Sequence, residues 1–314
     1  MCATIMPATA PMAAYRVSMR HLISILLLSL MTLPSLAWGQ KGHFLANEGA
    51  THAVPYELPR FFHDAYPGLV YMGYEADRWH GAGESSDEAF SSDHFLDWEY
   101  AAALELPRGR YEFIALLEKS GTLRANAIDN RTTGFVPWRV AETCELLERQ
   151  WQIWKRSSEP IERRQVERNI VYLAGLLGHY VADSANPHHA TIHYNGWVGA
   201  ENPESFRTDC GAHARFESDF VTRTVILGDI VPLMRPPTRR DDYFASALEF
   251  IRESHALVPA LYRLDRDGAF DGWGNEEGKR FAAERIATGS SWLRDLWWTA
   301  YLNGIEGRPR KEQR

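Results

Sequence analysis

The sequence lacks a surplus of basic residues. It contains 34 lysines and arginines against 41 aspartates and glutamates, for a formal net charge of −7. Proteins that bind duplex nucleic acid with release of counterions carry basic surfaces. The excess of acidic residues therefore argues against stable duplex binding. Internal repeats and low-complexity segments are also missing. The hydrophobic fraction of 45% is ordinary for a globular protein and excludes a disordered chain.

Cysteine is scarce, with 3 residues in the whole chain. Cys2 lies in the N-terminal segment described below, which leaves Cys144 and Cys210 in the remainder. These two are compatible with one disulfide or with two separate thiols, because connectivity cannot be read from sequence. Two cysteines cannot build a thiolate zinc site. Any metal site must therefore use histidine and carboxylate ligands.

The hydrophobic run near the N-terminus is too short to span a membrane. Residues 22–36 carry no charge and form a stretch of about 15 residues, whereas a membrane-spanning helix needs roughly 20. Basic residues precede this run, and the small residues Ser35 and Ala37 occupy the positions that a signal peptidase reads. The sequence therefore predicts a signal peptide at residues 1–37, cleaved after Ala37, and a secreted or periplasmic protein. Met1 and Met19 both remain possible starts.

Apolar residues recur at helical spacing along the rest of the chain. One stripe advances by three and four positions and consists of Val140, Cys144, Leu147, Trp151 and Trp154. A second has the same spacing and consists of Val166, Ile170, Leu173, Leu177 and Tyr180. Its helix should begin near Pro160 and end near Asn186-Pro187, because the residue before a proline disfavours the helical conformation.

Further helices are expected at residues 56–65, 109–119, 212–224, 241–257 and 276–303. No sustained polar–apolar alternation predicts a strand. Loops are expected where glycine, serine or proline gathers, at residues 80–93, 190–211 and 228–240. The aromatic residues of the last helix, Trp292, Trp297, Trp298 and Tyr301, are expected in the core rather than on a membrane-docking face. The sequence predicts a single all-α domain at residues 38–314.

Histidines and carboxylates form two pairs with helical spacing. His179 and Asp183 are four residues apart, as are His213 and Glu217, and His189 lies between the pairs. Residues four apart project from one face of a helix, so each pair can chelate one divalent ion. A single pair of this kind is more often a surface ion pair. Because ionisable groups are costly to bury unless paired or metal-bound, two pairs in apolar helices predict a metal site.

The residues that follow the predicted cleavage point carry a more specific pattern. They read Trp38-Gly39-Gln40-Lys41-Gly42-His43, and Asp77 and His94 come next, before the two pairs. In this order the chain resembles the superfamily of zinc-dependent phospholipases C and single-strand-specific nucleases, which are trinuclear zinc phosphodiesterases. The likeness extends from residue 38 to about residue 220.

The resemblance implies a multi-helix domain of that type, with three zinc ions between the helices. One ion would bind Asp77, His94, His179 and Asp183, and a second would bind His189, His213 and Glu217. The third would bind His43 and the free amino group and carbonyl oxygen of Trp38, and would share Asp183. Asp77 would orient or deprotonate the attacking water, which makes it the catalytic residue.

Two branches of the superfamily compete for this chain. The pattern Trp-Gly-x-x-Gly-His is more like the nucleases, whereas Glu217 as the last ligand and the segment at residues 59–77 are more like the phospholipases C. Arg78 stands where choline-binding members carry an aromatic residue, which puts choline specificity in doubt. We expect the phospholipase C branch, with phospholipid as substrate and at most transient contact with a membrane surface. Single-stranded nucleic acid is the alternative substrate.

Substrate contacts are assigned to Arg78, Phe95 and Trp197. The two aromatic rings can stack on a base or cover a lipid headgroup, and the guanidinium can bind phosphate. The competing interpretation is that the rings pack in the core or a loop and that Arg78 is a solvated charge. A secreted zinc-binding protein without turnover is a third functional possibility, although none of the nine ligand positions carries a residue that would block catalysis.

Overall fold

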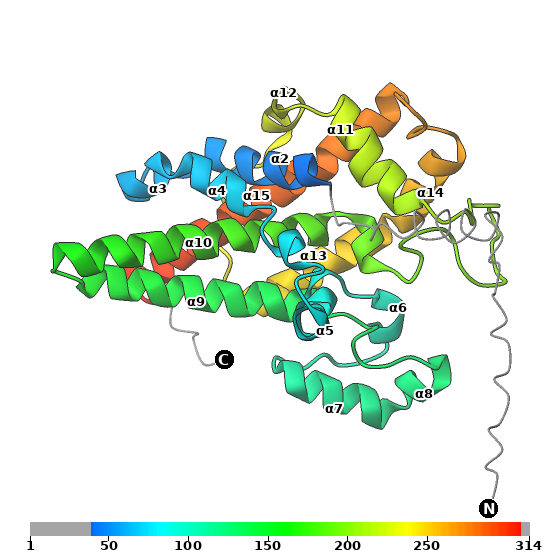
Figure 1. Ribbon diagram of the computed structural model, residues 1–314, viewed down its shortest axis with the longest axis horizontal. Helices are drawn as coiled ribbons and strands as arrows, with labels where there is room; N and C mark the ends of the chain where they lie inside the picture. Colours follow the sequence, from blue (N-terminus) through cyan, green and yellow to red (C-terminus); the bar gives the residue numbers. More distant parts are fainter. Residues whose placement is uncertain (1–38, 309–314) are drawn as a thin grey trace, which may run out of the picture. The chain divides into compact units, whose positions relative to one another are not determined.

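The computed structural model describes residues 39–308, which belong to one compact unit (Figure 1). The predicted all-α class is confirmed. Within residues 39–308 no strand is present, and the only β-type pairings are isolated bridges, Leu96 with Gly134 and Tyr194 with Gly196. No helix in this range is long and apolar enough to cross a membrane. The predicted signal peptide and the expected ligand Trp38 lie outside the described residues.

The helices alternate between long and short elements. The first half of the described chain contains α2 (Gln40–His52), α3 (Arg60–Asp64), α4 (Tyr66–Met72), η1 (Ala76–Trp79), α5 (Glu84–Phe90), η2 (Ser91–His94), α6 (Trp98–Ala101), α7 (Arg110–Ser120), α8 (Thr122–Asn126) and α9 (Val136–Arg156). The second half contains α10 (Pro160–Ala185), η3 (Pro187–Ala190), η4 (Ala214–Phe220), α11 (Val221–Thr224), α12 (Leu227–Ile230), η5 (Val231–Leu233), α13 (Tyr243–Ala256), α14 (Val258–Arg266) and α15 (Glu276–Glu306). The η elements are short 3-10 helices, except that η4 is a π-helix.

Helix α10 is the centre of the packing. It contacts α9 along one side and α2, α4, α13 and α15 on its others. Figure 1 shows α9 and α10 side by side, with α2 and α4 across α10 from α9. Every residue from Ala174 to Ala190 is buried, so the C-terminal part of α10 is enclosed on all faces. A helix enclosed in this way can present polar side chains only to a polar interior site.

The two long predicted helices are confirmed. In α9 the side chains of Val140, Cys144, Leu147 and Trp151 are fully buried. Helix α10 begins at Pro160 and ends at Ala185, directly before Asn186-Pro187. The amphipathic stripe and the proline rules therefore suffice to place these two elements.

The prediction of a loop at residues 80–93 is wrong. Helix α5 occupies Glu84–Phe90 and η2 follows directly. The acidic residues Glu84 and Asp87 lie in the first turn of α5, where negative charge is favourable, and Asp87 accepts a hydrogen bond from the Gly81 amide. The expected loop at residues 228–240 likewise contains most of α12 and all of η5.

Small residues on α10 allow its neighbours to approach closely. A Cβ on Gly178 would lie 1.9 Å from the Oδ1 atom of Asn47 in α2, and one on Gly175 would lie 2.5 Å from Cβ of Met72 in α4. The Asn47 side chain is fully buried and donates hydrogen bonds to the carbonyls of Leu69 (2.7 Å) and Gly175 (3.0 Å). Asn47 thus ties together the three helices that carry or border the histidine residues described below.

Aromatic side chains fill the main core. Trp292 and Trp297 of α15 are each 1% exposed, which confirms their predicted core positions. Phe250 stacks on Trp292, and the Trp297 indole donates to the Ala174 carbonyl at 2.9 Å. Cys144 is buried and Cys210 is exposed, and both are free thiols, so the two do not form a disulfide.

The C-terminal end of α10 is capped by side chains from other helices. Ser254 donates to the Ser184 carbonyl at 2.6 Å, and Nε of the buried Arg285 donates to the Ala185 carbonyl at 3.0 Å. These bonds satisfy carbonyl groups that lack a partner within the helix. They fix the position at which the chain leaves α10 and turns toward His189.

Candidate metal centre

Four side chains converge beside the last turns of α10. His179 Nε2 lies 3.2 Å from Asp183 Oδ2 across one helical turn. His94, at the end of η2, brings Nδ1 to within 3.0 Å of both of these atoms. Asp77 of η1 places Oδ1 3.5 Å from His179 Nε2 and 3.8 Å from His94 Nδ1. Donor atoms of a tetrahedral zinc site lie about 3.3 Å apart, so these separations fit one ion.

A second group lies beyond the end of α10. The Nε2 atoms of His189 and His213 are 3.0 Å apart, and Glu217 Oε2 is 2.7 Å from His213 Nε2 and 3.7 Å from His189 Nε2. The three donors therefore surround a common point, as expected for a second ion.

The π-helix η4 positions Glu217 within this second group. The sequence predicts an α-helix there, but η4 closes wider turns over Ala214–Phe220, and His213 immediately precedes it. Such turns occur mostly as local features at functional sites. His213 and Glu217 remain on one face of this wider helix. They therefore make the predicted contact, although the backbone is a π-helix and not the predicted α-helix.

His43 of α2 joins the first group from the opposite side. Its ring is fully buried and stacks on the His179 ring with a centroid separation of 4.0 Å. His43 Nε2 lies 3.6 Å from Asp77 Oδ2 and 3.6 Å from Asp183 Oδ1. Each of these carboxylates thus directs one oxygen toward His94 and His179 and the other toward His43. Both are placed to bridge two ions, whereas the resemblance implies bridging for Asp183 alone.

The described chain begins beside the second group. A Cβ on Gly39 would lie 2.9 Å from the Cα atom of Ser218, the residue after Glu217. This close backbone approach explains why a glycine follows position 38. It brings the start of α2 next to the donor groups, which is where the expected ligand Trp38 would be needed.

Several buried donor atoms in these groups have no hydrogen-bond partner. They are both ring nitrogens of His43, both carboxylate oxygens of Asp77, Oδ1 of Asp183 and Oε1 of Glu217. Buried polar atoms in folded proteins are nearly always satisfied, and an unpaired buried carboxylate is especially costly. Divalent cations would satisfy these atoms together. The donor set of imidazole and carboxylate, without thiolate, is one that zinc and other divalent transition metals accept.

Burial and mutual proximity shift the pKa values of these groups strongly. Burial lowers the pKa of His94 and of His213 to about 4 and raises that of Glu217 to about 8. Burial also disfavours a charged His179, but the Asp183 and Asp77 carboxylates outweigh it and raise the His179 pKa to about 9. Such opposed shifts are typical of functional sites, and the neutral histidines are in the form that binds metal.

Backbone groups orient the histidine rings. His179 Nδ1 faces the Gly73 carbonyl at 3.0 Å, and His189 Nδ1 faces the His94 carbonyl at 2.8 Å. These contacts turn Nε2 of each ring toward its donor group. Asn186 donates to Glu217 Oε2 at 3.0 Å. Outer contacts of this kind set the tautomer and direction of metal-binding side chains.

The three expected substrate contacts all have partners within the fold. Arg78 donates to Glu75 Oε2 at 2.8 Å, and its guanidinium lies 4.1 Å from the centre of the Tyr71 ring. Phe95 is half-buried and packs closely against Gly134. A Cβ atom on Gly134 would lie 2.2 Å from the Phe95 carbonyl oxygen.

Trp197 stacks on His193 at a centroid distance of 3.8 Å and packs against Phe206 and Tyr262. These contacts favour the packing interpretation for both aromatic residues. The contact with Tyr71 places the Arg78 guanidinium against α4.

Three residues near the donor groups are not among the site residues predicted from the sequence. His80 Nε2 lies 3.7 Å from Asp77 Oδ1, and the half-exposed Tyr194 ring lies 6.2 Å from that of His213. Asp93, which precedes His94, accepts hydrogen bonds from Arg110 and Arg139 and anchors the backbone of η2. Only His80 has a sequence signal, because it follows Asp77 by three residues; it directly follows the short helix η1 that carries Asp77.

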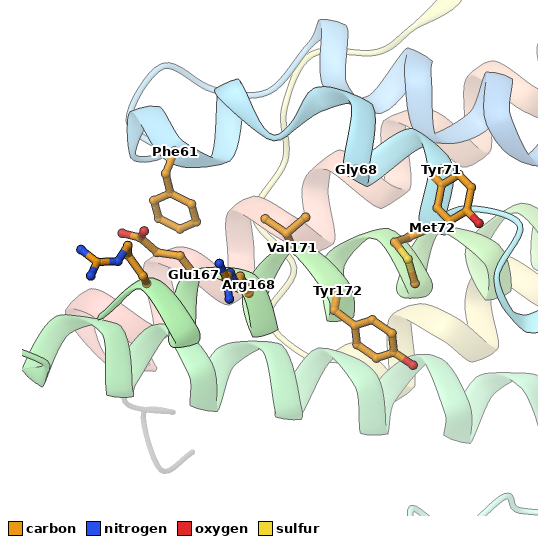
Figure 2. A pocket seen from close by; sticks show the side chains of 9 residues that line it. Phe61, Gly68, Tyr71, Met72, Glu167, Arg168, Val171 and Tyr172 are labelled. Atoms are coloured by element: carbon orange, nitrogen blue, oxygen red, sulfur yellow. The ribbon is translucent and has the colours of Figure 1, made fainter. Parts of the chain in front are cut away.

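A separate groove of about 520 Å³ lies between α4 and α10. Figure 2 shows its mainly apolar lining, with Phe61 toward one end and Tyr71 and Tyr172 toward the other. None of the metal-site donors lines it. Val171 precedes His179 by eight positions on α10, or about 12 Å along the helix axis. The groove is therefore distinct from the candidate metal centre.

Asp97 provides a prediction that does not depend on metal. Its side chain is buried, and burial, together with the nearby Glu99 carboxylate, raises its pKa to about 8. The folded chain therefore holds a proton that the unfolded chain releases between about pH 4 and 8, so the free energy of unfolding decreases as pH rises through that window. We expect Asp97→Asn to raise the midpoint of thermal unfolding by roughly 5 °C at pH 8 and by little at pH 4.

The matched control for this experiment is Asp64→Asn, because the Asp64 side chain is 63% exposed. Thermal unfolding followed by circular dichroism from pH 4 to 8 measures both variants. A difference between Asp97→Asn and the parent protein that stays constant across this range would contradict the assignment.

No family model matches the chain, and no curated protein matches it.

Proposed function

We propose that the protein is a zinc-dependent hydrolase of phosphoester bonds, of the phospholipase C type, with three zinc ions between its helices. One observation carries the proposal: buried histidines and carboxylates from distant parts of the chain converge, share Asp77 and Asp183, and leave donor atoms unpaired. The order of these residues along the chain, beginning at Trp38, supports the same superfamily.

The donor groups divide among three ions. The first would bind Asp77, His94, His179 and Asp183, and the second would bind His189, His213 and Glu217. His43 and Trp38 would hold the third, with Asp183 as the bridging carboxylate. When bound, these ions would supply positive charge that offsets an anionic phosphoester and acidifies a water molecule.

Asp77 has the position of a general base. Burial raises its pKa well above the usual range, so its carboxylate accepts a proton more readily than an exposed aspartate does. Asp77 would bind metal through one carboxylate oxygen and take the proton of the attacking water with the other. The rings of His43 and His179 stack on each other beside the shared carboxylates. No covalent intermediate on a protein side chain is required.

Phospholipid is favoured over nucleic acid as the substrate. The chain has no basic surplus, which weighs against a polyanionic nucleic-acid substrate. Glu217 as the last ligand supports the same branch. The start Trp-Gly-x-x-Gly-His keeps a single-strand-specific endonuclease as the second candidate. Under either function the signal peptide would place the enzyme outside the cytoplasm, in contact with its substrate.

The test uses protein that begins at Trp38 and is loaded with zinc. Hydrolysis of short-chain phospholipids and of single-stranded DNA and RNA is compared with and without a chelator. We expect release of diacylglycerol that the chelator abolishes. Cleavage of nucleic acid alone would assign the second candidate. Zinc binding without either activity would instead favour a non-catalytic zinc-binding protein.

A further inference from the structure

His80 is the most exposed histidine in contact with the candidate metal centre. It directly follows η1, and its side chain is 27% exposed, whereas those of Asp77 and His94 are 0% and 6% exposed. Its Nε2 atom lies 3.7 Å from Asp77 Oδ1, and its ring centre lies 5.0 Å from that of His94. Among the described residues, the His80 ring has no hydrogen-bond partner. The ring therefore lies beside a carboxylate that we assign to metal.

The oxygen that His80 faces is also the one shared by the first donor group. Asp77 Oδ1 lies 3.5 Å from His179 Nε2 and 3.8 Å from His94 Nδ1. Donor atoms of Asp77, His80 and His94 all lie within 4.8 Å of one another. His80 therefore approaches the first group from its solvent side, while α10 supplies His179 and Asp183 from the interior.

Two glycines in a surface turn follow His80. Gly81 and Gly83 adopt φ values of +76° and +157°, and a Cβ on either would have no heavy atom within 4 Å. The Gly81 amide donates to the Asp87 carboxylate, and the Gly83 carbonyl accepts from the amides of Ser86 and Asp87, so hydrogen bonds hold the backbone of this turn to α5. Exchange of His80 would therefore come from rotation of its side chain, which leaves the turn in place.

We propose that His80 is an additional, exchangeable ligand of the ion held by Asp77, His94, His179 and Asp183, and that an incoming phosphate displaces it. The proposal rests on the proposed metal centre. Zinc sites with an open position accept a fifth ligand, and imidazole is among the preferred donors. His80 would close the solvent side of the ion when no substrate is present. Displacement of His80 would make phosphate binding weaker than it would be at a permanently open position.

Cobalt(II) in place of zinc makes the coordination visible. The parent protein, His80→Ala and the control His63→Ala are purified in the form that begins at Trp38, loaded with cobalt and titrated with inorganic phosphate. His63 is an exposed histidine on α3, outside the donor groups. We expect His80→Ala to absorb visible light more strongly than the control, because loss of a ligand lowers the coordination number. We also expect it to bind phosphate about tenfold more tightly and to bind one zinc ion about tenfold more weakly.

Each outcome bears on the proposal. Identical spectra and identical phosphate affinities for His80→Ala and His63→Ala would overturn it. An unchanged spectrum with weakened phosphate binding would also overturn it, because His80 would then contact phosphate and not the metal. If the parent protein binds no cobalt or zinc, the metal centre itself fails. If it binds three ions and only the His80 effect is missing, the proposed function survives and this inference does not.

Discussion

Replacement of Asp183 by alanine is expected to lower phosphoester hydrolysis by at least about 1,000-fold, which corresponds to about 4 kcal/mol of lost transition-state stabilisation. Asp183 is fully buried and lies within 3.9 Å of ring nitrogens of His43, His94, His179 and His189. No other carboxylate contacts as many of the donor histidines among the residues that the structure describes. In the proposed metal centre, its loss would remove both a ligand and the carboxylate that bridges two ions.

Bound zinc should decrease together with the activity. Metal analysis of the purified variant is expected to find at least one ion fewer than in the parent protein. Asp183→Asn keeps the side-chain volume and should behave like the alanine variant, which separates loss of charge from formation of a cavity. Asp64→Ala on the surface is the control for the purification. Full zinc content with more than a tenth of the parent activity in Asp183→Ala would contradict the proposed centre.

Gly178→Ala is expected to destabilise the protein by about 2–3 kcal/mol, although alanine normally stabilises a helix relative to glycine. The added Cβ would lie 1.9 Å from Asn47 Oδ1. Asn47 cannot move aside without breaking its hydrogen bonds to Leu69 and Gly175, and its side chain is fully buried. The midpoint of thermal unfolding should therefore fall by roughly 5–10 °C.

A second glycine-to-alanine substitution provides the control. Gly68 lies in α4 on the same side of α10, but its Cβ would meet only Val171 at 3.4 Å, an ordinary contact. Gly68→Ala should be neutral or slightly stabilising. Because Gly178 neighbours His179, the Gly178→Ala variant should also bind zinc more weakly. Equal unfolding temperatures for the two variants would show that the packing around Asn47 is not the constraint.

The long helices could be predicted because each carries its own signal. Helices α9 and α10 have apolar stripes over many turns and a proline in the first turn, and they end directly before Ser157 and Asn186-Pro187. Helix α2 gives no such signal. Its buried positions include Gly42, Ala46, Gly49 and Ala50, which are small rather than strongly apolar. These residues are buried because neighbouring helices approach closely, a property of the tertiary structure that no local pattern contains.

The same distinction applies to the candidate metal centre. The spacing of His179 and Asp183 predicts their contact, because one helix holds both. His43, Asp77 and His94 join them only through the packing of α2, η1 and η2 on α10, so their assignment from sequence depended on the resemblance. His80 and Asp97 were missed for a related reason. One lies on an irregular turn and the other is a loop carboxylate, and burial in such segments has no periodicity.

The C-terminal end of α10 has an electrostatic consequence for the order of binding. The peptide dipoles of this 26-residue helix place about half a negative charge at its end, which favours cations there and disfavours anions. Arg285 already lies on one side of that end, and Asp183 lies in its last turn. The backbone itself therefore repels a phosphate until positive ions have bound. For the proposed reaction, the metals must bind first and the anionic substrate second.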